Sequence, residues 1–256
     1  METDPDLDAP GRKPLLGAWE AVSIDNLQAG LLAGDTVAVF RAPLPGTLNV
    51  RLSPEEEARA VRFVTPIDQE RFRASRRLLR RILARLLECS EQSLSFAPGD
   101  HGKPRIVAPP ATTGLRFNLS HSHDAWLLAV SRTAEVGVDI ERWRADVEVQ
   151  SLSERFFAPT EARILRGLAG EAALEAFFRA WTRKEALLKA RGVGLSGEIG
   201  SVAVLAALPG RSFHVGGFVV VDLPTEPGWS AALSIEGGLP AVRLFEITLR
   251  RQFEFA

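Results

Sequence analysis

The sequence has little of what disulfide-linked, membrane-spanning or nucleic-acid-binding proteins need. It contains a single cysteine, Cys89, so no intrachain disulfide can form, and a reducing cytoplasm is the simplest compartment. No stretch approaches the roughly 18 uninterrupted apolar residues of a transmembrane helix. The net charge of −1 argues against a general nucleic-acid binder, which is usually strongly basic. We therefore expect a soluble, cytoplasmic protein that binds neither nucleic acid nor membrane.

The beginning of the chain also lacks the basic, apolar pattern of a signal peptide. Acids and prolines dominate the first ten residues, and we expect residues 1–14 to form a flexible acidic tail. Hydrophobic residues make up 46% of the 256 residues, which is enough to build the core of one large domain or two small ones.

Hydrophobic periodicity predicts a similar order of elements in both halves of the chain. The expected helices begin at Ser53 and cover 68–87, 159–168 and 171–191, with shorter helical material around 151–155. The expected strands cover 37–40, 125–131, 136–141, 201–206, 212–222, 229–235 and 241–249. This order favours an α+β protein made of two pseudo-duplicated halves, 15–132 and 133–256, with the active site where the halves meet.

Two short runs place chemically active side chains at informative spacings. In residues 137–141, apolar and acidic residues alternate, so a strand end would hold Asp139 and Glu141 on one face. In helix 171–191, Glu185 falls on the apolar stripe and Lys189 follows one turn later. Burying a charge without a partner costs several kcal/mol of folding free energy. We therefore expect Glu185 and the two strand acids to share a partner of opposite charge. Three acids and a lysine predict a Mg²⁺ site that acts on a phosphate.

Each motif taken alone also has an ordinary structural explanation. The acids are equally compatible with an exposed strand face and a partnered helix acid. His121, between two serines, can donate to a phosphate, but an isolated histidine more often has a structural or surface role. Lys103, between a glycine and a proline, can reach an anion, but solvated loop lysines are common. The arginines of helix 68–87 have three competing explanations: they form a solvated face, they bind the phosphates of a ligand, or they bind nucleic acid.

Five motifs, taken in their order along the chain, resemble the Sfp-type 4′-phosphopantetheinyl transferases. They are Gly-Lys-Pro (102–104), Phe-Asn-Leu-Ser-His-Ser (117–122), Gly-Val-Asp-Ile-Glu (137–141), Phe-Phe-x-x-Thr-Glu (156–161) and Trp-Thr-x-Lys-Glu-Ala-x-x-Lys (181–189). Each motif is weak alone, but five in this order are specific. The resemblance implies the family's two-half α+β fold, in which each half packs helices on a small, mostly antiparallel sheet.

The resemblance also implies an activity and its site. The protein would move the phosphopantetheine arm of coenzyme A onto a serine of an acyl or peptidyl carrier protein, releasing adenosine 3′,5′-bisphosphate. Mg²⁺ ligation carries over to Asp139, Glu141 and Glu185. The positions that match coenzyme A contacts are Arg59, Arg71, Lys103, Pro104, Ser120, His121 and Lys189. Some relatives have a second basic residue one turn before Arg59, where this chain has Glu56, so the grip on the 3′-phosphate is expected to differ.

Elementary chemistry suggests roles for three of these residues. Breaking a pyrophosphate requires neutralisation of the charge that builds on the leaving phosphate, which Mg²⁺ and Lys189 can supply. The incoming serine hydroxyl needs a base within hydrogen-bond reach. Glu185 is the preferred base, acting directly or through water, and Glu161 is the second candidate. Metal ligation lowers the proton affinity of a carboxylate, which counts against Glu185.

Two other classes of protein compete with this interpretation. A different Mg²⁺-dependent phosphoryl or nucleotidyl transferase would use ATP, but the sequence has no Gly-x-x-x-x-Gly-Lys-Ser/Thr loop. A non-catalytic carrier-binding or nucleic-acid-binding module would not need the acids and Lys189, yet all are present. The sequence leaves open whether fatty-acid, polyketide or nonribosomal peptide carriers are modified. We expect a monomer, as is usual for two-half members of the family.

Overall fold

The computed structural model describes residues 16–44, 48–99, 102–110, 114–193, 200, 202–205 and 209–249. The expected acidic tail, 1–14, and part of the loop that precedes Lys103 lie outside these residues. Among the helices that are described, none has the length and apolar content needed to cross a bilayer.

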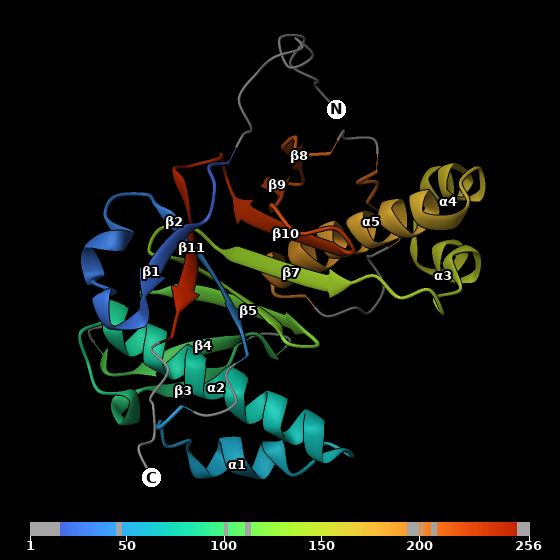
Figure 1. Ribbon diagram of the computed structural model, residues 1–256. Helices are drawn as coiled ribbons and strands as arrows, with labels where there is room; N and C mark the ends of the chain where they lie inside the picture. The colour runs from blue at the N-terminus through green and yellow to red at the C-terminus, as the bar shows by residue number, and fades with distance from the viewer. Residues whose placement is uncertain are drawn as a thin grey trace.

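In the described part of the chain, two strands are followed by helices α1 and α2, five strands by helices α3 to α5, and four strands come last (Figure 1). The strands are β1 (Glu20–Ser23), β2 (Val37–Pro43), β3 (Ser95–Pro98), β4 (Pro104–Ala108), β5 (Arg116–Ser122), β6 (Ala125–Ser131), β7 (Val136–Arg142), β8 (Phe213–Val215), β9 (Phe218–Asp222), β10 (Trp229–Glu236) and β11 (Val242–Thr248). The helices are α1 (Pro54–Ala60), α2 (Pro66–Leu86), α3 (Val149–Phe156), α4 (Pro159–Arg166) and α5 (Gly170–Arg191).

Local sequence signals account for the ends of the helices. Ser53 caps α1, because its hydroxyl accepts the backbone N–H of Glu56 while the Glu56 carboxylate accepts the backbone N–H of Ser53. Thr65 caps α2 through a hydrogen bond from the first turn. Helix α5 ends at Gly192, whose φ of 69° lies in the left-handed region that favours glycine.

Two sheets pack face to face between two layers of helices. The strand order is β1-β11-β2-β6-β5 in the first sheet and β7-β10-β9-β8 in the second, with β3 and β4 paired beside them. Within the described ranges, only the pairings of β11 with β1 and β2 are parallel. The predicted α+β class with small, mostly antiparallel sheets is confirmed.

The last strand, β11, returns to the first sheet and lies between β1 and β2. Val242 pairs with Val37 and Phe245 with both Phe40 and Glu20, so the two ends of the chain complete one sheet. The predicted C-terminal half, 133–256, is therefore not a self-contained unit, because its final strand belongs to the sheet of the other half.

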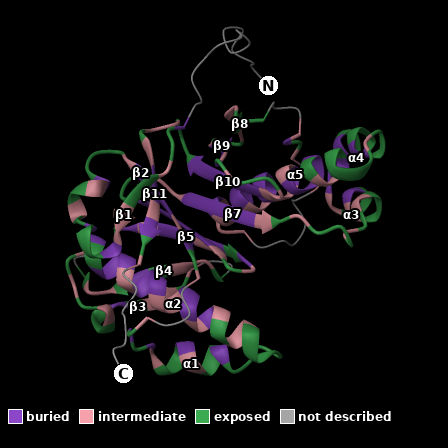
Figure 2. Ribbon diagram, viewed as in Figure 1, coloured by how far each residue is buried: buried purple, intermediate pink, exposed green. Residues whose placement is uncertain are grey.

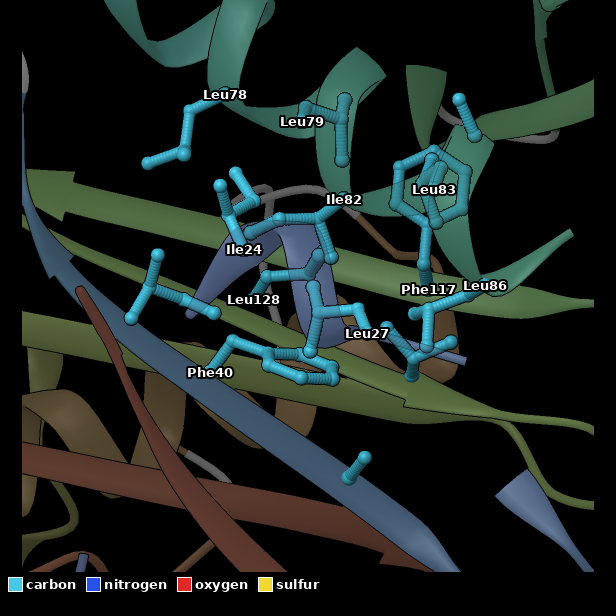
Figure 3. Packing of buried hydrophobic residues seen from close by; sticks show 14 of the residues in the cluster. Ile24, Leu27, Phe40, Leu78, Leu79, Ile82, Leu83, Leu86, Phe117 and Leu128 are labelled. Carbon is cyan, nitrogen blue, oxygen red and sulfur yellow. The ribbon is translucent and has the colours of Figure 1, made fainter. Parts of the chain in front are cut away.

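Three apolar clusters hold these layers together. Helix α2 packs Leu79 and Ile82 against Phe40 on the outer face of the first sheet (Figure 3). A second cluster, which includes Val39 and Val138, fills the space between the two sheets. A third joins α5 to α3 and α4. The burial of β7 and β10 in Figure 2 follows from this arrangement, because the second cluster covers one face of these strands and α5 the other.

Two predicted strands are wrong in detail. Residues 202–205 do not form the strand predicted for 201–206, because their backbone bonds to side chains; the N–H of Val204, for example, donates to Glu161 Oε1 at 2.5 Å. The single strand predicted for 212–222 is the β8–β9 hairpin, which turns at two glycines with positive φ.

Candidate active site

Strand β7 runs directly beneath helix α5. A β-carbon on Gly137 would lie 2.0 Å from the carbonyl oxygen of Ala186 and 2.3 Å from the backbone nitrogen of Ala190. Only glycine allows strand and helix to approach this closely. Because side chains alternate along a strand, Asp139 and Glu141 lie on the same face as Gly137, toward the helix.

The predicted alignment of Trp181, Glu185 and Lys189 along α5 is present in the structure. Each of these residues is half-buried, whereas the residues between them are buried. The buried residues anchor the helix, and the three half-buried side chains reach the boundary between protein and solvent.

Lys189, Asp139 and Ser120 form one hydrogen-bonded cluster. The ammonium of Lys189 donates to Asp139 Oδ1 at 2.6 Å and to Ser120 Oγ at 3.1 Å. The Ser120 hydroxyl donates to the same Asp139 oxygen at 2.8 Å. The Asp139 side chain is 4% exposed and that of Lys189 is 28% exposed, so the lysine forms the solvent-facing side of the pair. Three of the predicted site residues, from β5, β7 and α5, thus meet at the seam between the two sheets.

Strand β5 contributes two polar side chains to which sequence reasoning assigned no role. The Ser122 hydroxyl donates to Glu141 Oε2 at 2.7 Å, and Asn118 Oδ1 accepts the backbone N–H of Val138 at 2.9 Å. Asn118, Ser120 and Ser122 are two residues apart and share the face of β5 that meets β7. That period of two is the signal that could have identified them.

Two carboxylate oxygens at the seam, Asp139 Oδ2 and Glu185 Oε1, are buried and have no hydrogen-bond partner within the described ranges. Burial and the charges of Asp139 and Glu141 raise the pKa of Glu185 to about 7, against the opposing effect of Lys189. Burial and Asp139 also raise the pKa of Glu141. A divalent cation would relieve both the unpaired oxygens and the mutual repulsion. The donor set, made of carboxylate oxygens only, fits Mg²⁺.

The described residues contain no ready-made cluster of three or more His, Cys, Asp or Glu side chains that would hold a metal ion. Mg²⁺ usually keeps several waters and takes one or two carboxylates together with substrate phosphates. The assignment of Asp139, Glu141 and Glu185 as its ligands stays a prediction.

The ammonium of Lys103 is hydrogen-bonded within the protein. Its ammonium donates to the Glu135 carboxylate at 2.7 Å, to the Val136 carbonyl at 3.0 Å and to the Ala190 carbonyl at 3.1 Å. These bonds use all three ammonium hydrogens. Burial lowers the pKa of Lys103, although Glu135 opposes the shift. Lys103 therefore ties the start of β7 to the last turn of α5, and its expected contact with coenzyme A stays a prediction.

Comparison with known proteins identifies the family. The model of the "4′-phosphopantetheinyl transferase, N-terminal" family matches residues 47–133, and that of the "4′-phosphopantetheinyl transferase superfamily" matches residues 135–216. The chain is 36% identical over 213 residues to the 4′-phosphopantetheinyl transferase HetI of Nostoc sp., covering 80% of this chain and 90% of HetI. This chain belongs to the 4′-phosphopantetheinyl transferase family. It is also 28% identical over 173 residues to the 4′-phosphopantetheinyl transferase Sfp of Bacillus subtilis, covering 68% of this chain and 71% of Sfp.

The family predicted from the five motifs is confirmed, and two of its expected coenzyme A contacts lie near Lys189. Burial, followed by the positive charges of Lys189 and Arg71, lowers the pKa of His121, and Asp68 opposes this shift. Arg71 is also paired with Asp68 at 3.5 Å. His121 therefore lies within electrostatic range of both Lys189 and the first turns of α2 in this phosphopantetheinyl transferase.

Two other expected contacts, Arg59 and Pro104, line a cavity of about 550 Å³ between α1, α2 and the β3–β4 pair. Glu56, the departure from some relatives, forms ion pairs with Arg76 at 2.8 Å and with Arg80 at 2.7 Å. Glu56 thus neutralises two arginines beside this cavity instead of adding a positive charge.

Glu161, the second candidate base, does not belong to the Lys189 cluster. It is 1% exposed, and its Oε2 pairs with the ammonium of Lys184 at 2.8 Å and accepts the N–H of Ala158 at 3.1 Å. Its Oε1 accepts the N–H groups of Val204 and Leu205 at 2.5 and 3.0 Å. This carboxylate holds α4, α5 and the segment after α5 together, and these bonds occupy both of its oxygens. The geometry argues against Glu161 as the base.

Glu161→Gln should therefore lower stability rather than the chemical rate. Removal of the charge leaves the Lys184 ammonium buried without its counter-ion, which costs about 3–5 kcal/mol. Urea unfolding should show this loss, while kcat measured well below the unfolding midpoint stays within a few-fold of the parent value. Glu154→Gln is the matched control, because its ion pair with Arg166 is exposed and worth less than about 1 kcal/mol. A stable but inactive Glu161→Gln protein would restore Glu161 as the base.

Proposed function

We propose that the protein transfers the phosphopantetheine arm of coenzyme A to the acceptor serine of an acyl or peptidyl carrier protein, releasing adenosine 3′,5′-bisphosphate. Its Mg²⁺ is held by Asp139, Glu141 and Glu185. The observation that carries the proposal is the cluster of Lys189, Asp139 and Ser120, together with two buried oxygens, Asp139 Oδ2 and Glu185 Oε1, that lack a hydrogen-bond partner among the described residues. The names of the relatives support the same activity.

When bound by these carboxylates, Mg²⁺ neutralises the negative charge of the pyrophosphate that is cleaved. Side chains of the protein stabilise the leaving phosphate and position the carboxylates. Lys189 presents its ammonium to the phosphate that leaves as the bisphosphate, where negative charge builds up. Ser120 donates to Asp139 and keeps this carboxylate in place beside the lysine.

Glu185 is the base that we propose for the carrier serine. A base must lie within hydrogen-bond reach of the proton that it takes, directly or through one water. Glu185 lies one helical turn before Lys189 on the same half-buried stripe, and its Oε1 accepts no hydrogen bond from the part of the chain that the structure describes. Glu161 is engaged elsewhere, which leaves Glu185 as the carboxylate in position for this role.

Mass spectrometry of carrier proteins tests the proposal directly. Apo-carriers from fatty-acid, polyketide and nonribosomal peptide systems would be incubated with the protein, coenzyme A and Mg²⁺. One phosphopantetheine arm should appear on one serine, and EDTA should prevent it. The ranking of the carriers would then name the pathway. No mass gain on any carrier, or a product formed from ATP without coenzyme A, would contradict the proposal.

Lys189→Ala should lower kcat strongly while changing the KM for coenzyme A little. Loss of one group that stabilises a developing negative charge costs about 10²–10³ in kcat. Lys189→Arg should recover part of the rate, because it keeps the positive charge. Steady-state kinetics with coenzyme A varied at saturating carrier would measure both effects. A rise in KM at unchanged kcat would assign Lys189 to substrate binding alone.

We also propose that the protein works in the cytoplasm as a monomer. The single cysteine, Cys89, supports a compartment in which disulfides are not needed.

A further inference from the structure

Exposed apolar side chains gather at the connection between α1 and α2. Val61 is 62% exposed, Phe63 39%, Val64 96% and Ile67 58%. We call these four residues the apolar tip. In the part of the chain that the structure describes, the only other large apolar residues exposed to this degree are Val107 and Ile164. Figure 2 shows this tip as exposed surface at the end of both helices. Such a concentration of apolar surface is typical of an interaction site.

The apolar tip lies on the same side of the molecule as the proposed active site. Helix α2 begins at Pro66, and its first turns carry Asp68 and Arg71, which both act electrostatically on His121. The positive charge of Lys189 also acts on His121. In Figure 1 the α1–α2 connection lies on the same side of the molecule as the ends of β5 and β7. A partner seated on the tip would therefore lie on the side of the molecule where His121 and the ends of β5 and β7 are.

The charges around the apolar tip favour an acidic partner. Asp68 pairs with Arg71, and Arg73 is shared by Glu70 and by Glu57 of α1. Arg62, within the tip, is exposed and has no ion pair among the described residues. Residues 57–73 carry four arginines against three acids, so this surface has an excess of one positive charge.

We propose that the apolar tip is a docking surface for the carrier protein, which presents apolar side chains and carboxylates beside its acceptor serine. The proposal rests on the proposed function and adds the place where the protein substrate is held. The serine has to reach Lys189 and Glu185 while the rest of the carrier stays outside. Its surface must therefore rest on the rim of the site, and the tip offers apolar area and positive charge there.

The double variant Val64→Glu/Ile67→Glu tests this surface. Both side chains are exposed, so the fold should be unaffected. The KM for the carrier should rise about tenfold, which corresponds to about 1.4 kcal/mol. The dissociation constant of coenzyme A, measured by calorimetry, and kcat at saturating carrier should not change. Ile164→Glu is the matched control, because Ile164 is 49% exposed on α4, and its carrier KM should stay at the parent value.

Arg62→Glu tests the charge separately. It should raise the carrier KM several-fold at low salt, and the difference from the parent protein should shrink as ionic strength rises, because exposed charges are screened.

The outcomes separate the alternatives. An unchanged carrier KM in the double variant overturns the proposed docking surface. The proposed function still stands in that case, provided that the parent protein transfers the arm. Weaker binding of coenzyme A without a change in carrier KM also overturns it. Two further tests address other occupants: sedimentation with phosphatidylcholine–phosphatidylserine vesicles, and the oligomeric state in ultracentrifugation. If the double variant alters either of these but not the carrier KM, the tip binds lipid or a second copy instead. A parent protein that modifies no carrier overturns both proposals together.

Discussion

Glu185→Gln should reduce formation of the modified carrier by about 10³-fold or more, because the variant loses both a charge that binds the cation and the proposed base. Glutamine has the same shape, so packing on α5 should be preserved. The assay is the initial rate of mass gain by an apo-carrier at saturating coenzyme A and Mg²⁺.

The same variant should not be less stable than the parent protein. Folding raises the pKa of Glu185 from 4.5 to about 7, so in the metal-free protein the folded state is favoured while this carboxyl is protonated. That contribution is present below about pH 4.5 and is lost as the pH rises to about 7. Glutamine stays neutral, so urea unfolding in EDTA above pH 7 should show a variant at least as stable as the parent.

Two further variants complete the test of the three-acid assignment. Asp139→Ala should also abolish transfer, because it removes the partner of Lys189 together with a proposed metal ligand. Glu175→Gln, at a half-exposed pair with Arg179 on the same helix, should leave the rate unchanged. Near-normal transfer by Glu185→Gln or Asp139→Ala would remove the basis for the assignment.

Gly137→Ala should destabilise the fold by about 3 kcal/mol or more, at the upper end of what overpacking of a core costs. The added methyl group would meet backbone atoms of Ala186 and Ala190, which cannot rotate away. Helix α5 would have to move off β7, and the 2.6 Å pair between Lys189 and Asp139 would separate. Urea unfolding should show the lost stability, and transfer should fall even where the variant remains folded.

Gly238→Ala is the control for this effect. No atom lies within 4 Å of a β-carbon at Gly238, and its φ is outside the left-handed region. Its stability should stay within about 0.5 kcal/mol of the parent, as for most surface changes. If Gly137→Ala kept the parent stability, the close crossing of β7 and α5 would not be what positions the site.

Much of the site was predictable because it depends on local periodicity. Alternation along residues 137–141 placed both acids on one face, and the helical repeat placed Glu185 and Lys189 one turn apart. Both arrangements follow from backbone geometry alone. The helices 68–87 and 171–191 were predicted to within a few residues, since their caps and apolar stripes are encoded locally.

The partners of the charged side chains could not be predicted in this way. Lys103 and Glu161 belong to family motifs, but only the structure shows their partners. Lys103 bonds to the start of β7 and the end of α5, and Glu161 bonds to Lys184 and the segment around Val204. Ser122 received no role, yet it holds Glu141. These pairings join residues far apart in the chain, and no local pattern specifies which of several nearby partners a charge will meet.

By itself, the sequence determined the α+β class, the family and the residue types of the proposed site, because periodicity and motif order are written along the chain. The tertiary structure alone decided the rest. It placed β11 between β1 and β2, brought β7 and β5 together at the seam, and let α5 cross at Gly137. Long-range pairing depends on which apolar faces can be buried together, and that is a property of the whole packed molecule.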